Sequence, residues 1–132
     1  MDLFSKDWAE AYMKLINSDV EYKENGKGWV NPIRFVSLHE HEKKAVWLDL
    51  KNGVCEQSLC GKAALAANSS YEIQAENKAW KSLLETKGDP LVALFTGKLK
   101  LTKGSLFTLT RFTASAKDLV RIASIVEISE MD

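Results

Sequence analysis

The spacing of apolar residues predicts two helices near the N-terminus. One helical face carries Trp8, Tyr12, Leu15 and Ile16. Ser5 precedes this face and can cap the helix, because a serine oxygen accepts hydrogen bonds from free backbone amides of the first turn. Ser18 or Asp19 can cap a short second helix that extends through Tyr22.

Helical spacing returns in the second half of the chain. A first apolar face is formed by Ala79, Trp80, Leu83 and Leu84. Asp89-Pro90 then places an N-cap before a proline at the first helical position, and Gly97 ends that helix. A short helix is expected within residues 105–112. Thr113 or Ser115 can cap the last helix, whose apolar face contains Leu119, Ile122, Ala123 and Val126.

Between the helical regions, the pattern is typical of β-strands. Asn52-Gly53 is a favourable hairpin turn, and segment 61–70 is ambiguous because its alanine-rich stretch favours a helix but is short. Strands are expected over residues 33–40, 45–50, 54–59, 71–74 and 98–102. We therefore predict a single α+β domain over residues 1–132, with a five-stranded, mostly antiparallel sheet covered by helices.

Charge and terminal sequences narrow the class of protein. Eighteen basic residues balance eighteen acidic residues, which argues against a nucleic-acid partner because such proteins neutralise phosphates with a basic excess. The N-terminus has no signal-peptide pattern, and no apolar run approaches the ~20 residues of a membrane span. Glu130-Met131-Asp132 is not a peroxisomal signal. We expect a cytoplasmic protein without stable membrane insertion.

Candidate reactive residues give little support for catalysis. Cys55 and Cys60 are five apart on one predicted strand, so we expect reduced thiols on opposite faces. His39 and His41 are more typical of a solvated hairpin tip than of a metal site. Asn25-Gly26-Lys27-Gly28 lacks the full glycine pattern of a nucleotide loop. The sequence therefore predicts no catalytic residue, no metal ligand and no cofactor.

The order of several short motifs resembles the sterol carrier protein 2 (SCP-2, sterol-transfer) family, as a small standalone prokaryotic-type member. Leu3–Tyr12 is similar to the helical opening of such members, and Asp49–Gly53 resembles their second hairpin. The strongest match to the family's "W…G…DP…GKLK…G" pattern is Ala79-Trp80-Lys81, Gly88-Asp89-Pro90-Leu91, Leu94-Phe95-Thr96-Gly97-Lys98-Leu99-Lys100 and Gly104.

The resemblance implies an apolar tunnel between sheet and helices, and non-catalytic binding and transfer of a fatty acid, acyl-CoA, sterol or similar lipid. An alternative is an accessory domain that presents an apolar substrate to a partner enzyme. Two further alternatives are a thiol-dependent enzyme that uses Cys55 or Cys60, and an interaction domain whose apolar helices form a dimer. The ligand and the oligomeric state are not fixed by the sequence.

The candidate ligand contacts are apolar, and the last helix could act as a lid over them. Arg111, Lys117 and Arg121 could meet a headgroup, or could form a solvated helix face. An empty cavity of about 300 Å³ would cost about 7 kcal/mol, so the tunnel is expected to be filled, collapsed or open to water. The expected lining residues are Phe35, Leu94, Phe95, Leu99, Phe107, Phe112, Leu119, Ile122 and Val126.

Overall fold

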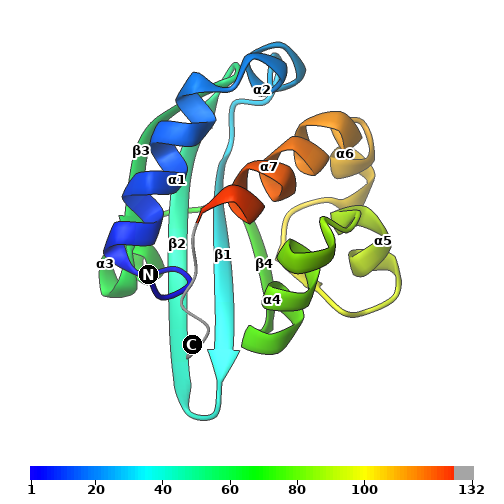
Figure 1. The fold of residues 1–132 in the computed structure, drawn as a ribbon. Helices are drawn as coiled ribbons and strands as arrows, with labels where there is room; N and C mark the ends of the chain where they lie inside the picture. The colour runs from blue at the N-terminus through cyan, green and yellow to red at the C-terminus, as the bar shows by residue number, and fades with distance from the viewer. Residues whose placement is uncertain (127–132) are drawn as a thin grey trace.

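One five-stranded sheet runs through the centre of the protein (Figure 1). The computed structural model describes residues 1–126. The prediction that residues 130–132 form no peroxisomal signal, and the last six residues of the predicted domain, lie outside the described residues. The strand order is β3-β2-β1-β4-β5, with β1 parallel to β4 and the other neighbours antiparallel, which confirms the mostly antiparallel prediction. The strands are β1 (Pro32–His39), β2 (Glu42–Lys51), β3 (Val54–Cys60), β4 (Tyr71–Glu76) and β5 (Lys100–Lys103).

Helices cover both faces of the sheet, but unequally. In Figure 1, α1 lies over β2 and β3, α7 crosses the middle, and α4 and α5 lie on the side of β4. The smaller α3 packs against the opposite face of the sheet through Ala64, which contacts a separate small cluster around Val36 and Ala45. The helices are α1 (Lys6–Ser18), α2 (Val20–Asn25), α3 (Gly61–Ala66), α4 (Asn77–Thr86), α5 (Pro90–Phe95), α6 (Leu106–Thr110) and α7 (Thr113–Ile125).

Three of the predicted helix caps are present. Ser5 Oγ accepts a hydrogen bond from the Trp8 amide at 3.2 Å at the start of α1. Asp19 caps α2, and Asp89 caps α5 ahead of the proline at the first helical position. These caps were predictable because each depends on residues within three positions of one another.

The predicted cap of α7 is wrong. Phe112 occupies the N-cap position, and neither hydroxyl of the two expected caps accepts from the first turn. Instead, Thr113 Oγ1 donates to Thr110 O at 2.9 Å, and Ser115 Oγ donates to Phe112 O at 3.0 Å. Only Arg111 and Phe112 separate α6 from α7. Both hydroxyls therefore bond to carbonyl oxygens of the preceding turn, and Phe112 O also accepts from the Ala116 amide at 3.0 Å.

The fifth strand begins two residues later than predicted. The Leu99 amide donates to Ala93 O of α5 at 3.1 Å, so residues 98 and 99 belong to the end of that helical unit. Leu99 is buried, and only the next residues pair with β4. The alternation of lysine and leucine over residues 98–102 therefore predicts a strand correctly only from residue 100, because residues 98 and 99 lie in the turn after α5.

A bulge in β3 overturns the predicted placement of the cysteines. Cys55 lies opposite Leu50 and Cys60 lies opposite Val46, with Glu56 left out of the pairing. The extra residue reverses the alternation, so both thiols lie on the same face of the sheet instead of opposite faces. Their partners are four residues apart along β2, a separation of about 13 Å, and both cysteines are free.

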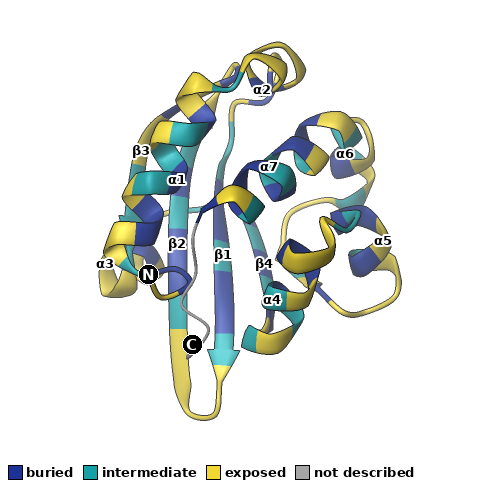
Figure 2. Cartoon of the chain, viewed as in Figure 1, coloured by how far each residue is buried: buried dark blue, intermediate teal, exposed yellow. Residues whose placement is uncertain are grey.

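The hairpin between β1 and β2 carries both histidines at its exposed tip, as predicted (Figure 2). Among residues 1–126, no group of three His, Cys, Asp or Glu side chains is placed to hold a metal ion. No helix in the same part of the chain is long and apolar enough to cross a membrane. Buried residues concentrate instead on the sheet face under α1, α4 and α7.

Candidate functional site

An apolar pocket lies between this sheet face and the helices above it, with a volume of about 70 Å³. Alternation along the strands places every second side chain on this face. The sheet contributes Ile33 and Phe35 from β1, Leu50 from β2 and Ile73 from β4. The aromatic residues Phe4, Trp8, Tyr12, Tyr22, Trp29, Trp80 and Phe112 form much of the surrounding wall.

The helix α7 forms one side of the pocket with residues at helical spacing. Ser115 and Ala116 line it, followed by Leu119 and Val120 one turn later, and then Ala123. The two alanines leave space where a larger side chain would fill the interior. No charged side chain of residues 1–126 lines the pocket. An ionised group inside it would therefore lose its hydration without a countercharge.

Five of the nine predicted contact residues line this pocket: Phe35, Leu94, Leu99, Phe112 and Leu119. Ile122 and Val126 are buried in the adjoining core but are not part of the pocket wall.

Phe95 and Phe107 are not part of the pocket wall either. They are 66% and 72% exposed, on the short helices α5 and α6. Contact between a ligand and any of the nine residues stays a prediction.

Several wall residues were not among the predicted contacts. Their spacing predicts that Trp8 and Tyr12 lie on the apolar face of a first helix and Trp80 on that of a later one. The structure confirms this, with Trp8 and Tyr12 buried on α1 and Trp80 buried on α4. Sequence periodicity identifies such a face but does not distinguish a solid core from the wall of a pocket. Their aromatic character was the only available signal, since aromatic side chains are common in ligand pockets.

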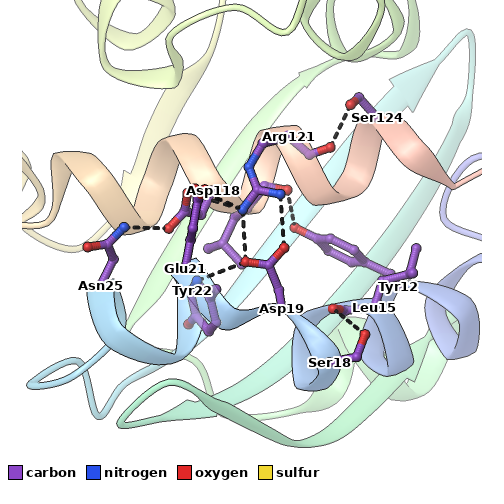
Figure 3. Close-up of polar contacts among 11 residues, drawn as sticks. Tyr12, Leu15, Ser18, Asp19, Glu21, Tyr22, Asn25, Asp118, Arg121 and Ser124 are labelled. Atoms are coloured by element: carbon purple, nitrogen blue, oxygen red, sulfur yellow. Dashed lines mark hydrogen bonds and ion pairs between the residues drawn. The ribbon is translucent and has the colours of Figure 1, made fainter.

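A polar network holds α7 against the N-terminal helices (Figure 3). The Arg121 guanidinium donates to both carboxylate oxygens of Asp19, at 2.9 and 2.8 Å, and to Asp118 at 3.3 Å. Asn25 of α2 donates to the other oxygen of Asp118 at 2.8 Å. The Arg121 hydrogen bonds hold the pKa of Asp19 below its usual range, although partial burial acts in the opposite direction.

Further contacts join α7 to its neighbours. The Tyr12 hydroxyl donates to Leu119 O at 2.8 Å, and burial raises the pKa of this tyrosine well above its usual value. Lys117 lies 3.6 Å from the Asp89 carboxylate at the start of α5. Arg121 and Lys117, two of the three predicted headgroup contacts, are therefore already engaged by carboxylates.

The third candidate, Arg111, lies over the ring of Phe107, 5.1 Å from its centroid. This places its guanidinium at the exposed end of α6, where the aromatic ring is the cation's neighbour.

The Cys55 thiol is not activated for catalysis. Burial raises its pKa to about 12, and the thiol donates to Gln57 O at 3.4 Å. A cysteine nucleophile reacts as the thiolate, and this thiol stays protonated at neutral pH.

The pocket is smaller than those that usually hold small molecules, which are about 300–1,000 Å³. A void of 70 Å³ costs about 2 kcal/mol, far less than the larger cavity considered from the sequence. The resting geometry is therefore that of a largely collapsed apolar cavity. A larger occupant requires outward movement of the covering helices.

Comparisons with known proteins give matches among solved structures. No protein-family model and no curated protein matches the chain. A crystal structure of sterol carrier protein 2 superposes with a TM-score of 0.88 and 28% identity, over 96% of this chain and 100% of that one. A solution structure of a conserved hypothetical protein from Thermus thermophilus, described as possibly sterol carrier protein, has a TM-score of 0.87 and 28% identity. It covers 98% of this chain and 93% of its own.

A more distant structure shares the fold. The apo form of sterol carrier protein 2 from Yarrowia lipolytica matches with a TM-score of 0.59 and 15% identity, over 92% of this chain and 98% of that one. The two stronger matches extend over nearly the whole of both chains, including the sheet and the helices that enclose the pocket. They support the resemblance to the sterol carrier protein 2 family that the sequence motifs predict, and the chain has the fold of these sterol carrier proteins.

Proposed function

We propose that the protein binds a lipid or another apolar small molecule in the pocket beside α7 and carries it through the cytoplasm without chemical change. The observation that carries this proposal is the pocket wall, which is apolar on both the sheet side and the helix side and contains no charged side chain of residues 1–126. The similarity to proteins described as sterol carriers supports the same function.

The energetics of apolar burial favour such a complex. A buried methylene contributes about 0.8 kcal/mol, so a sixteen-carbon chain gains about 12 kcal/mol on leaving water. Opening the cavity by moving α7 away from its neighbours breaks the contacts of Arg121 and Tyr12. Hydrogen bonds of this kind contribute about 1–3 kcal/mol each, so the three donated by Arg121 and the one donated by Tyr12 offset part of the apolar gain.

A matched pair of substitutions on α7 tests this site. Ala116 lines the pocket, whereas Ala114 of the same helix is exposed. Ala116→Leu and Ala114→Leu each add three carbon atoms, but only the first places them in the cavity. We expect Ala116→Leu to weaken binding of a fluorescent fatty acid, cis-parinaric acid, at least tenfold, and Ala114→Leu to bind as the unmodified protein does.

The readout is a fluorescence titration, with thermal unfolding to verify that both variants fold. Equal affinity for the two folded variants would contradict binding in this pocket. Native mass spectrometry of the isolated protein, followed by solvent extraction, would identify a ligand retained from the cell. Recovery of a stable complex with an enzyme, in place of free carrier, would favour the alternative that this domain presents an apolar substrate to a partner.

A further inference from the structure

One residue of the pocket wall, Trp8, carries a buried polar atom without a hydrogen-bond partner among residues 1–126. Trp8 is 1% exposed and lines the pocket, and its Nε1 is without a partner among residues 1–126. The other tryptophans differ, because the indole nitrogens of Trp29, Trp47 and Trp80 each donate to a backbone carbonyl oxygen, at 2.6, 3.0 and 2.9 Å. Trp8 is thus the exception among four indoles in one chain.

Two aromatic rings pack against the Trp8 indole. Its ring packs edge-on against Phe4, with centroids 5.2 Å apart, and tilted against Tyr12 at 4.8 Å. The Tyr12 hydroxyl is directed elsewhere, because it donates to Leu119 O. Most buried polar groups in proteins are paired, and an indole nitrogen can only donate. The missing partner must therefore supply an acceptor atom.

The pocket also limits the charge of that acceptor. No lysine, arginine or histidine of residues 1–126 lines the cavity, so a carboxylate or phosphate placed beside Trp8 would lack a countercharge. A ketone, ester or hydroxyl oxygen avoids this cost and can still accept the hydrogen bond.

We propose that the ligand is a neutral, largely apolar molecule whose oxygen accepts a hydrogen bond from Trp8 Nε1 inside the pocket. This inference rests on the proposed function and narrows its ligand class. A purely hydrocarbon ligand leaves the donor unpaired, whereas a ligand with an ionised headgroup must keep that group outside the pocket.

The test compares two probes that differ by one oxygen. Trp8→Phe removes the indole donor but retains an aromatic ring. We expect this change to weaken binding of 2-dodecanone about three- to tenfold, the usual effect of one neutral hydrogen bond, and to change dodecane binding less than twofold. Both affinities are measured by displacement of a neutral fluorescent probe, N-phenyl-1-naphthylamine. Trp80→Phe is the matched control, because its indole already donates to Val36 O, and we expect equal effects on both probes.

A second measurement does not depend on a variant that folds. In the unmodified protein, the Trp8 indole N–H resonance should move downfield when 2-dodecanone is added and not when dodecane is added. Equal losses for the two probes in Trp8→Phe, or the absence of a ketone-specific shift, would overturn this inference while leaving apolar binding intact. Failure of both probes to bind the unmodified protein would instead overturn the proposed function.

Discussion

Arg34 is buried on the sheet face opposite the pocket, where it fixes α3. Its Nε donates to the Glu72 carboxylate at 2.9 Å, and its guanidinium donates to the carbonyl oxygens of Ala64 and Ala67 at 3.3 and 2.7 Å. Burial raises the pKa of Glu72, but hydrogen bonds from Arg34 and Thr102 outweigh it and leave that pKa below its usual range. The Arg34 guanidinium therefore binds the carbonyl oxygens at the C-terminal end of α3. This contact lies on the face of the sheet that does not line the pocket.

Two glycines with similar backbone angles allow a test at single residues. Gly53 and Gly97 have φ of 84° and 81°. A Cβ on Gly53 would collide with the backbone of Lys23 in α2, whereas a Cβ on Gly97 would have no neighbour within 4 Å. We expect Gly97→Ala to lower the free energy of unfolding by about 1 kcal/mol, from the left-handed backbone alone. Gly53→Ala should lower it by about 3 kcal/mol or more.

Urea denaturation of both variants measures the difference. Equal losses of unfolding free energy in the two variants would contradict this prediction. They would mean that the β2–β3 hairpin moves away from Lys23 of α2 at little cost.

Helix caps were predictable from the sequence because the capping residue and the amide that it binds are close together in the chain. Ser5, Asp19 and Asp89 cap their helices as expected. The opposite-face placement of Cys55 and Cys60 failed because a bulge depends on pairing with another strand, which the sequence of one strand does not contain.

At the scale of elements, α7 lines the pocket and is also held by a polar network. Most of its apolar face was visible in the sequence spacing. Its attachment through Arg121 and Asp19 was not, because these residues are about a hundred positions apart and only the fold brings them together. The same limit hid the parallel pairing of β1 and β4, whose partners Ile33 and Tyr71 lie on separate strands far apart in the chain.

The Arg121–Asp19 pair should make the stability of the fold depend on pH. Because the folded state lowers the Asp19 pKa, the pair contributes its full stability above the unfolded value of about 3.9 and loses it as the pH falls through the lowered folded value. We expect Arg121→Met to reduce the free energy of unfolding by about 1 kcal/mol at pH 7, a modest value because the guanidinium is one-third exposed. As the pH falls below about 3.9, the difference from the unmodified protein should decrease.

The measurement is urea denaturation at several pH values. Lys117→Met is the control, because its ion pair with Asp89 is 3.6 Å long and partly exposed, and we expect a loss below about 0.5 kcal/mol. If α7 is the helix that opens, Arg121→Met should also accelerate ligand uptake about fivefold in a stopped-flow experiment. A pH-independent difference in stability, or unchanged uptake, would contradict the role given to this network.

For the whole molecule, the sequence predicted the fold class and the strand number, and its motifs predicted the resemblance to sterol carrier protein 2 that the solved structures support. Predicting the pocket was harder, because Leu94, Phe35 and Trp8 have the same apolar character as residues of a solid core. Whether apolar side chains fill a space or surround it depends on how the layers are spaced, which no periodicity in the chain records.

The account depends on an apolar ligand lying between the sheet and α7. The most direct test is to measure nuclear Overhauser effects between bound 2-dodecanone and the alanine methyl groups of the protein. The account predicts contacts from the ligand chain to Ala116 and Ala123, which line the pocket, and none to the exposed Ala114. Contacts confined to Ala114 or to the exposed rings of Phe95 and Phe107, with none to Ala116 and Ala123, would contradict it.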